Sequence, residues 1–491
     1  MKSGDGRWLI LLTVIVGTFL GRLDQTIVNL ALPKIIQDFS ITVSEAGWIA
    51  TAYILANAVF VPIWGKLGDT IGRKKVYIWG FTIFIVGSIL AGLAWDLKSM
   101  IFFRIIQAIA SSADYPTAMA ILTVTFKEGK ERAEALGLWS AAFAASAVLG
   151  PLLGGPLIDI FGWRSVFLIN LPIGVIGLVM AWLYINESVS EKKTVSFDVL
   201  GALTLGIALS ALVLVLDQGL DWGWTSLNSI ICYLAMVVFT YLFYKIESTH
   251  PEPIVDLKFF SHSAFVNTLI NNFVVFMGMM GGMFLIPTFV QIFLGYDATQ
   301  TGYVFLPMAF GLVLAAPMGS RMIGKVEPKY VIAASTAVAA LSLFLFTSLD
   351  PRSQPIEIMV PMFIMAFGLG FGMPQRTNII ASTVPKHEIG SASSTLALVR
   401  NIAGAFGIAV FATILKSSIE WNVLAISQNS VLYAFDPTTY AQFAGLIILK
   451  AQILSYRTVF LCSAIIIAIG AILALWINIK ETSHGEEIFV E

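Results

Sequence analysis

The stretch GKLGDTIGRKKVY, residues 65–77, separates two apolar runs at 45–65 and 76–95. A membrane-spanning helix needs about 20 mainly apolar residues, and both runs reach that length. The stretch itself is basic, and its three glycines permit a tight turn. It therefore predicts a short loop between two membrane helices.

The same alternation of apolar runs and short polar loops continues along the whole chain. Its 491 residues are 57% hydrophobic and 12% charged, which is too apolar for an ordinary soluble surface. We expect an all-α polytopic membrane protein. The pattern predicts fourteen transmembrane helices, at about 8–31, 45–65, 76–95, 99–124, 133–157, 164–185, 198–217, 226–246, 262–290, 300–320, 329–348, 355–375, 389–415 and 452–478.

Two polar linkers divide these helices into groups of six, two and six. NESVSEKKTVSFD and ESTHPEPIVDLKFFSH flank the pair at 198–246. We expect an N-terminal six-helix bundle in residues 1–186, linkers and an inserted helix pair in 187–261, and a C-terminal six-helix bundle in 262–491. The longest stretch without a predicted span, about 416–451, is an outer loop that forms either a hairpin or interfacial segments, or else stays only partly ordered.

The distribution of basic residues predicts the orientation of the chain. The loops on the side of the termini hold 19 Lys and Arg residues, among which we count Arg376, and the opposite loops hold seven. Because cytoplasmic loops are enriched in Lys and Arg, both termini are expected in the cytoplasm. The chain is then a multi-pass protein of the cell membrane, inner or plasma.

Composition and motifs argue against several other classes of protein. The net charge of -1 is not that of a nucleic-acid binder. Cys232 and Cys462 lie far apart in apolar runs, with no spacing typical of a metal site or disulfide framework. No HExxH, Walker-type loop or nucleophile elbow is present, so we expect no enzyme, no ATP-driven pump, no cofactor and no metal.

The stretch FLGRLDQTIVN, residues 19–29, places two charges inside the first span. A charge at bilayer depth costs on the order of 2.5–3.5 kcal/mol even on lenient scales, so it is normally paired or faces a wet cavity. Arg22 and Asp24 point to different faces, since two helical positions are rotated by about 200°. Matching depths on the first and fourth spans predicts two pairs across them, Asp24 with Arg104 and Arg22 with Asp114.

The loop at 65–77 resembles the loop signature of the major facilitator superfamily. In that family the loop latches two six-helix bundles on the cytoplasmic side. The resemblance implies that Gly65, Asp69, Gly72 and Arg73 form a cytoplasmic gate. Thr70 departs from the signature, because the family usually has a basic residue there.

The stretch GLWSAAFAASAVLGPLLGGPL, residues 137–157, is rich in small residues that let membrane helices pack closely. By composition alone it is a helix-packing surface. It also resembles the antiporter motif of proton-driven exporters in the same superfamily, although Ser146 replaces one expected glycine. The resemblance implies export, and the motif residues are Gly137, Gly150, Pro151, Gly154 and Gly155.

Four further stretches resemble the fourteen-helix drug:proton antiporters, the multidrug and quaternary-ammonium exporter branch. They are LDQTIVNLALP, GWRSVFLINLPIG, IPTFVQIFLGYDATQTGYVFLP and LVRNIAGAFGIAV. The resemblance implies alternating access with proton coupling through Asp24 and Arg104, with Gln107 nearby. Arg22 and Asp114 depart from the branch pattern. We include Asp114 among the residues expected to take part in proton coupling. For the pair itself, a structural bridge and a contact with substrate are both possible roles.

The predicted substrate cavity combines residues from both bundles. Lipophilic drugs, including cationic ones, are the expected substrates. Intramembrane arginines outnumber the acids, however, so a neutral, zwitterionic or anionic metabolite is an alternative, and a non-transporting sensor or scaffold is a third. The expected partners are protons, a small amphipathic substrate and membrane lipid, with no nucleic acid; we expect a functional monomer and keep an adaptor protein as a candidate partner. The cavity residues are Arg22, Asp24, Gln107, Asp114, Asn271, Met277 and Arg400.

Overall fold

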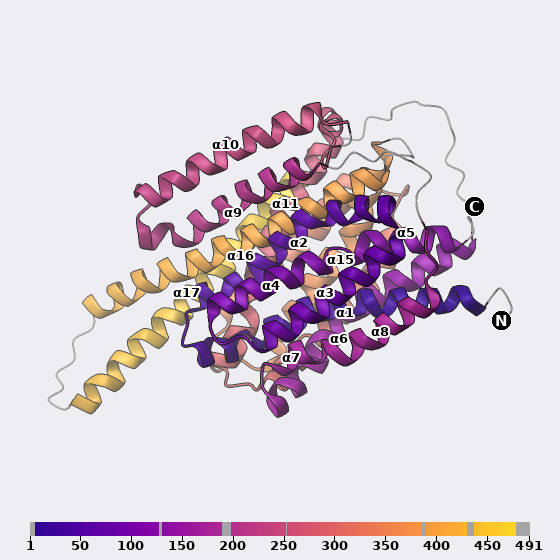
Figure 1. The fold of residues 1–491 in the computed structure, drawn as a ribbon. Helices are drawn as coiled ribbons and strands as arrows, with labels where there is room; N and C mark the ends of the chain where they lie inside the picture. The colour runs from indigo at the N-terminus through magenta and orange to yellow at the C-terminus, as the bar shows by residue number, and fades with distance from the viewer. Residues whose placement is uncertain are drawn as a thin grey trace.

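The computed structural model describes residues 5–126, 130–188, 198–251, 253–384, 389–429 and 437–477, and within these ranges the chain contains helices and no strand. Figure 1 shows the helices packed side by side along one long axis. The elements are α1 (Asp5–Phe39), α2 (Val43–Ile71), α3 (Arg73–Gly92), α4 (Leu97–Ser111), α5 (Asp114–Thr125), α6 (Lys130–Phe161), α7 (Ser165–Leu168), α8 (Asn170–Tyr184), α9 (Val199–Trp222), α10 (Leu227–Thr249), the 3-10 helix η1 (Leu257–Ser261), α11 (Ser263–Phe293), α12 (Ala298–Val304), α13 (Leu306–Ser320), α14 (Pro328–Leu345), the 3-10 helix η2 (Phe346–Ser348), α15 (Pro355–Ser382), α16 (Ile389–Gln428) and α17 (Pro437–Ala474).

Twelve helical segments in these described ranges are long and apolar enough to cross a bilayer. Two of them, α7–α8 and α12–α13, each consist of two helices in sequence. Two further segments complete a set of fourteen in the described chain: α4–α5, which is broken at Ser112–Ala113, and α6, whose apolar part is Leu149–Phe161. The predicted all-α fold with fourteen transmembrane helices is confirmed.

Local chemistry determines where several helices begin. A capping box starts α2, because the Thr42 hydroxyl accepts a hydrogen bond from the Glu45 amide at 3.2 Å and the Glu45 carboxylate accepts one from the Thr42 amide at 2.8 Å. Asp96 caps α4 in the same way, and hydrogen bonds from Ser99 hold the pKa of the Asp96 carboxyl below its ordinary value. Gly72 separates α2 from α3 with a φ of 111°, a conformation that residues with a Cβ rarely adopt.

The chain forms two bundles, one of α1–α8 and one of α11–α17. A core that includes Val14, Phe81 and Leu122 fills the first bundle. A second core joins the bundles, because Ile27 and Leu30 of α1 pack with Phe289 of α11 and its neighbours. We call the end of the molecule where α1 begins the terminal face and the opposite end, where α1 finishes, the far face. The core shared by the two bundles lies toward the far face.

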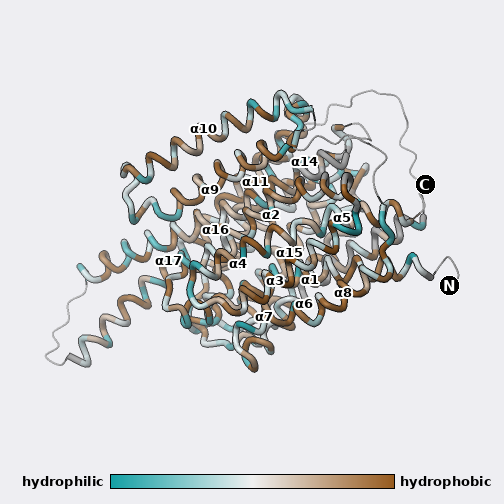
Figure 2. The backbone as a smooth tube through the Cα atoms, in the orientation of Figure 1, coloured by the Kyte–Doolittle hydropathy of each residue, from teal (hydrophilic) through white to brown (hydrophobic). Residues whose placement is uncertain are grey.

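The inserted pair α9–α10 packs against both bundles at once (Figure 1). Val213 of α9 lies in one apolar cluster with Leu55 of α2 and Ala405 of α16. α10 packs mainly on α9, and its outer side exposes large apolar residues such as Leu234 and Val237. Figure 2 shows that hydrophobic residues recur along α10. An exposed apolar face of this length suits contact with lipid.

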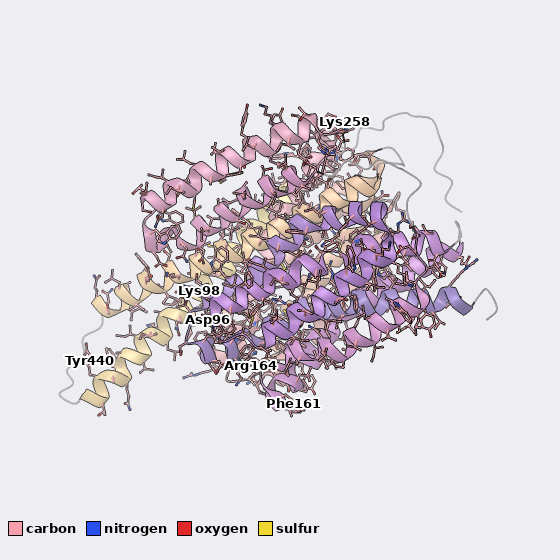
Figure 3. The ribbon with its side chains drawn as sticks, in the orientation of Figure 1. Asp96, Lys98, Phe161, Arg164, Lys258 and Tyr440 are labelled. Atoms are coloured by element: carbon pink, nitrogen blue, oxygen red, sulfur yellow. The ribbon has the colours of Figure 1, made fainter. Side chains whose placement is uncertain are left out.

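The stretch at 416–451, which the sequence left open between a hairpin and a partly ordered loop, is largely helical. α16 continues to Gln428, and α17 begins at Pro437. At about 1.5 Å per residue the 40 residues of α16 extend well beyond a hydrocarbon core of about 30 Å. Figures 1 and 3 accordingly show both helices projecting from the far face, with Tyr440 near the tip of α17. The outer loop expected over 416–451 is thus replaced by two helical extensions in 416–428 and 437–451.

The structure corrects the predicted position of one basic residue. Arg376, which the sequence count placed in a loop on the side of the termini, lies inside α15 and is only 2% exposed. The charged loops otherwise separate along the long axis: in Figure 3, Lys98 and Arg164 lie toward the far face and Lys258 toward the opposite end. The span predicted at 355–375 ended too early, because α15 continues to Ser382.

Candidate functional site

A buried ion pair lies in the core of the first bundle. The Arg104 Nη1 atom of α4 is 2.6 Å from the Asp24 Oδ2 atom of α1, and the two side chains are 2% and 0% exposed. The predicted pairing of Asp24 with Arg104 is confirmed. Because both charges are removed from water, separating the two side chains would leave a buried charge without its partner, which is energetically unfavourable.

Two amides complete the surroundings of Asp24. Gln107 Nε2 and Asn170 Nδ2 each donate a hydrogen bond of 2.9 Å to the Asp24 Oδ1 atom. Asn170 also donates to the Ser88 hydroxyl at 2.8 Å, which links α8 to α3. The Asp24 carboxylate therefore receives three donors, and both of its oxygens are hydrogen-bonded.

Sequence reasoning missed Asn170 and Ser88 as members of this network. Both are 0% exposed. The signal available was the single polar residue Asn170 inside the apolar run VFLINLPIG, residues 166–174. An amide buried in a membrane helix requires a partner, although only the packing of α8 identifies that partner.

Aromatic rings hold the Arg104 guanidinium in place. Its central carbon lies 4.0 Å from the centroid of the Tyr53 ring and 5.7 Å from that of Phe167. The Tyr53 hydroxyl in turn donates to the Ser111 hydroxyl at 2.7 Å. Arg104 is thus fixed by an ion pair on one edge and by the Tyr53 ring on one face.

Arg22 and Asp114 form the second charged group of the first bundle. Arg22 interacts electrostatically with Asp114 and donates a hydrogen bond of 2.8 Å to Gln25. The Asp114 carboxyl accepts a hydrogen bond from Thr18, while its Oδ1 atom is buried without a hydrogen-bond partner among the described residues. The structure therefore brings Arg22 and Asp114 together, as their matched depths predict, and separates them from Asp24.

A small cavity lies beside Asp114. Tyr77, Ser111 and Asp114 contribute polar groups to its otherwise apolar lining, and its volume is about 20 Å³. A cavity of this size has room for a single water molecule. Of the two acids Asp24 and Asp114, Asp114 is consequently the one that lines this cavity.

Arg376 of α15 and Arg400 of α16 lie in the interior of the second bundle. Arg376 Nε donates to the Asn271 Oδ1 atom at 2.8 Å, and its Nη2 atom donates to the Thr336 hydroxyl at 2.6 Å. Arg400 Nε donates to the Asn272 Oδ1 atom at 3.3 Å. No carboxylate in the described part of the chain forms an ion pair with either guanidinium.

The predicted cavity residues divide into two groups in the structure. Asp24, Gln107 and Asn271 are 0% exposed and bonded within their own bundles. Met277 is partly buried, and its backbone packs against Gly407 of α16. Arg22, Asp114 and Arg400 are less buried, and Tyr115, which sequence reasoning missed, interacts electrostatically with both Arg22 and Arg400.

The residues of the glycine-rich stretch at 137–157 serve close helix packing. Gly150 and Gly154 of α6 lie against Thr26 and Ile27 of α1. Gly155 lies against the backbone of Thr299 in α12, which belongs to the other bundle. The Gly302 backbone similarly approaches the Pro151 carbonyl, whereas the surroundings of Gly137 lie outside the described contacts.

The stretch at 65–77 was predicted as a loop, but it is helical except at Gly72, because α2 continues to Ile71 and α3 begins at Arg73. Its described contacts go to the first bundle and to the residues that directly follow α8. The Arg73 Nη1 atom donates to the Ala120 carbonyl at 3.4 Å, and the Arg73 amide donates to the Ser188 carbonyl at 3.1 Å. Gly72 lies against the Glu187 carboxylate. Helix α2 includes Gly65 and Asp69, but the surroundings of these two residues lie outside the described contacts.

Comparisons with known proteins agree with this architecture. The family model described as Major Facilitator Superfamily matches residues 14–408. A solved structure described as a bacterial homolog to the human lysosomal transporter Spinster, inward-facing and unoccupied, has a similar fold, with a TM-score of 0.71 at 16% identity over 96% of this chain and 97% of that one. At that identity the likeness concerns the fold alone.

Sequence relatives cover nearly the whole chain. The multidrug transporter protein MdtP of Bacillus subtilis is 29% identical over 96% of this chain and 93% of its own. The multidrug resistance protein Stp of Mycobacterium tuberculosis is 30% identical over 83% of this chain and 76% of its own. The riboflavin transporter RibZ of Clostridioides difficile is 29% identical, covering 88% and 94%. The chain therefore belongs to the Major Facilitator Superfamily, as a membrane transporter of the branch that contains these multidrug transporters.

Proposed function

We propose that this transporter is a proton-coupled exporter of small amphipathic molecules that works by alternating access. The observation that carries the proposal is a pair of acids in one bundle with opposite surroundings. Asp24 is bonded to Arg104, Gln107 and Asn170, while one oxygen of Asp114 has no hydrogen-bond partner among the described residues. Coupled transporters need such intramembrane acids at the site where ions are exchanged.

The two acids suit different parts of a proton cycle. A proton can bind the unpartnered Asp114 oxygen without breaking an existing hydrogen bond, and it would leave the Arg22 charge less compensated. At Asp24 a proton would compete with the 2.6 Å contact from Arg104. We therefore propose that Asp114 takes up the proton in this conformation, and that helix movement at the Asp24–Arg104 pair couples the proton to substrate release.

The contacts between the bundles support alternating access. Near the far face, Gln291 of α11 donates to the Leu30 carbonyl of α1 at 3.0 Å. Asp159 of α6 accepts from the Thr299 amide at 2.8 Å and from the Thr299 hydroxyl at 2.6 Å. An opening toward the far face must break these bonds, which are few enough for reversible rearrangement.

The direction of transport follows from the proposed orientation and the α6 stretch. The basic residues favour cytoplasmic termini, so the terminal face is the inner one. The close approach of α6 to α1 and α12 gives the antiporter-like stretch a concrete role in closing the far face. The names of the relatives, multidrug transporters and a riboflavin transporter, support a small organic molecule as the substrate.

Proteoliposomes that contain the purified full-length chain test the proposal. An imposed pH gradient should drive uptake of ethidium, riboflavin or fluorescein, with proton movement in the opposite direction. Asp24→Asn and Asp114→Asn should each abolish uptake driven by the gradient, and Asp350→Asn, an exposed loop change, should leave it intact. Normal gradient-driven uptake in both core variants would falsify the proposed coupling.

A further inference from the structure

We propose that the region between the bundles binds the anionic group of an amphipathic organic anion, a carboxylate or sulfonate attached to an aromatic body, with Arg400 as its principal contact. This inference rests on the proposed transport function and specifies the class of substrate. It departs from a preference for cationic drugs. The argument begins with the surroundings of Arg400.

Arg400 of α16 is oriented but not neutralised. Its Nε atom donates to Asn272 Oδ1 at 3.3 Å, and Asn272 is itself oriented by a 2.9 Å hydrogen bond from its Nδ2 atom to the Thr268 carbonyl. The Arg400 Nη2 atom is buried and has no hydrogen-bond partner among the described residues. A buried charged donor in this condition gains a strong, charge-assisted hydrogen bond when a ligand anion accepts from it.

The neighbouring charge in the second bundle has the same sign. Arg376 and Arg400 influence each other electrostatically, and the described hydrogen bonds of the Arg376 side chain go to neutral oxygens of Asn271 and Thr336. The acids of the first bundle have nearer partners, since Asp24 bonds Arg104 and Asp114 interacts with Arg22. The described side chains around Arg400 therefore carry a net positive charge, which attracts an anion and repels a cation.

One aromatic ring contacts the same guanidinium, and a tyrosine of the other bundle interacts with it electrostatically. The central carbon of the guanidinium lies 5.2 Å from the Phe276 ring centroid. Tyr115 of the opposite bundle interacts electrostatically with Arg400, is 42% exposed and lies with its ring 5.2 Å from that of Trp139. Tyr115 provides aromatic contact area and a hydroxyl group. This combination fits an aromatic body that carries an acidic group.

Two dyes with one ring system and opposite charge test the inference directly. Fluorescein is an anion and rhodamine 6G a cation, and 1-anilinonaphthalene-8-sulfonate serves as a second anion. Binding to the purified full-length chain in nanodiscs is measured by fluorescence anisotropy or intensity. We expect at least one of the anions to bind more tightly than rhodamine 6G and to be displaced by an excess of the other anion.

Variants identify the contact. Arg400→Gln should weaken binding of the anion about tenfold or more, as expected for loss of a charge-assisted hydrogen bond, and should change rhodamine 6G binding less than twofold. Arg400→Lys keeps the charge but loses the planar fork of the guanidinium. Its affinity for the anion should therefore lie between those of the unmodified chain and Arg400→Gln. Arg352→Gln, an exposed loop change, should match the unmodified chain. Equal thermal unfolding midpoints for the Arg400 variants establish that the loss is not one of folding.

The outcomes separate this inference from the proposed function. If anion binding depends on Arg400 but no gradient-driven transport occurs, the inference is supported and the proposed proton coupling is wrong. If a pH gradient drives transport of rhodamine 6G but anion binding does not depend on Arg400, the proton coupling is supported and the inference is wrong. Absence of binding for both anions, or anion binding that is unchanged in Arg400→Gln, also overturns it.

Discussion

Asn170 shows how much of the charged core depends on single neutral side chains. It donates to both Asp24 and Ser88 and is completely buried. Its loss leaves the Asp24 Oδ1 atom with Gln107 as its remaining described donor. A hydrogen bond to a charged group contributes more to stability than a neutral one.

Replacement of this amide is predicted to destabilise the protein without changing its net charge. Asn170→Ala should lower the free energy of unfolding by about 1–3 kcal/mol, measured as a lowered thermal midpoint in detergent. Asn429→Ala is the matched control, because the described hydrogen bond of that exposed amide goes to the Ala425 carbonyl one turn earlier. Equal midpoints for the two variants would show that the Asp24 network does not depend on Asn170.

Arg22 and Asp114 are predicted to be energetically coupled. Arg22→Gln and Asp114→Asn should each lower the free energy of unfolding. In the double variant this free energy should fall by about 0.5–3 kcal/mol less than the sum of the two single losses. The reason is that removing one member leaves the other as an uncompensated intramembrane charge. The same cycle with Arg22→Gln and Asp350→Asn should be additive. Additivity in both cycles would exclude the compensation.

At the scale of elements, α6 determines how closely the bundles approach at the far face. A Cβ added at Gly155 would meet the backbone of Thr299, and backbone atoms cannot turn aside as a side chain can. The Asp159–Thr299 hydrogen bonds one turn later depend on the same approach. Helix α9 adds a second connection, because Trp48 and Ser44 of α2 donate to Asp217, and Thr413 of α16 donates to the Leu216 carbonyl at 2.8 Å.

Gly155→Ala is predicted to shift the molecule away from closure at the far face. Cysteines introduced at Gln291 should react faster with a water-soluble maleimide in the Gly155→Ala background, in protein whose Cys232 and Cys462 are replaced by alanine. Gly445→Ala in α17 is the control, since no atom lies within 4 Å of a Cβ added there. Equal labelling rates in the two backgrounds would contradict a role of α6 in closure.

At the scale of the whole molecule, the basic loops predict which face meets the cytoplasm. A cysteine at Asn429, in the extension of α16, should be labelled by an impermeant maleimide in intact cells. A cysteine at Ser261, after the inserted pair, should be labelled only after permeabilisation, because it lies on the side of the basic loops. Labelling with the opposite pattern would invert the proposed direction of transport.

The charged core was partly predictable from the sequence. Charges inside apolar runs must find partners, so Asp24, Arg104, Arg22 and Asp114 were identifiable, and helical rise alone matched their depths. Arg376 was misplaced because hydropathy does not show where a helix of the second bundle ends. Asn170 and Tyr115 were missed as partners, since which face of a helix meets which neighbour depends on packing rather than on local pattern.

The sequence by itself determined the number of membrane helices, their order and the inserted pair, because a bilayer imposes a length and an apolarity that each segment must satisfy alone. Only the tertiary structure decided which polar groups meet. Asp24 finds three donors from two other helices, whereas Arg400 has Asn272 as its described hydrogen-bond partner and no described carboxylate beside it. Those partnerships depend on rotation and depth of separate helices, which no single segment encodes.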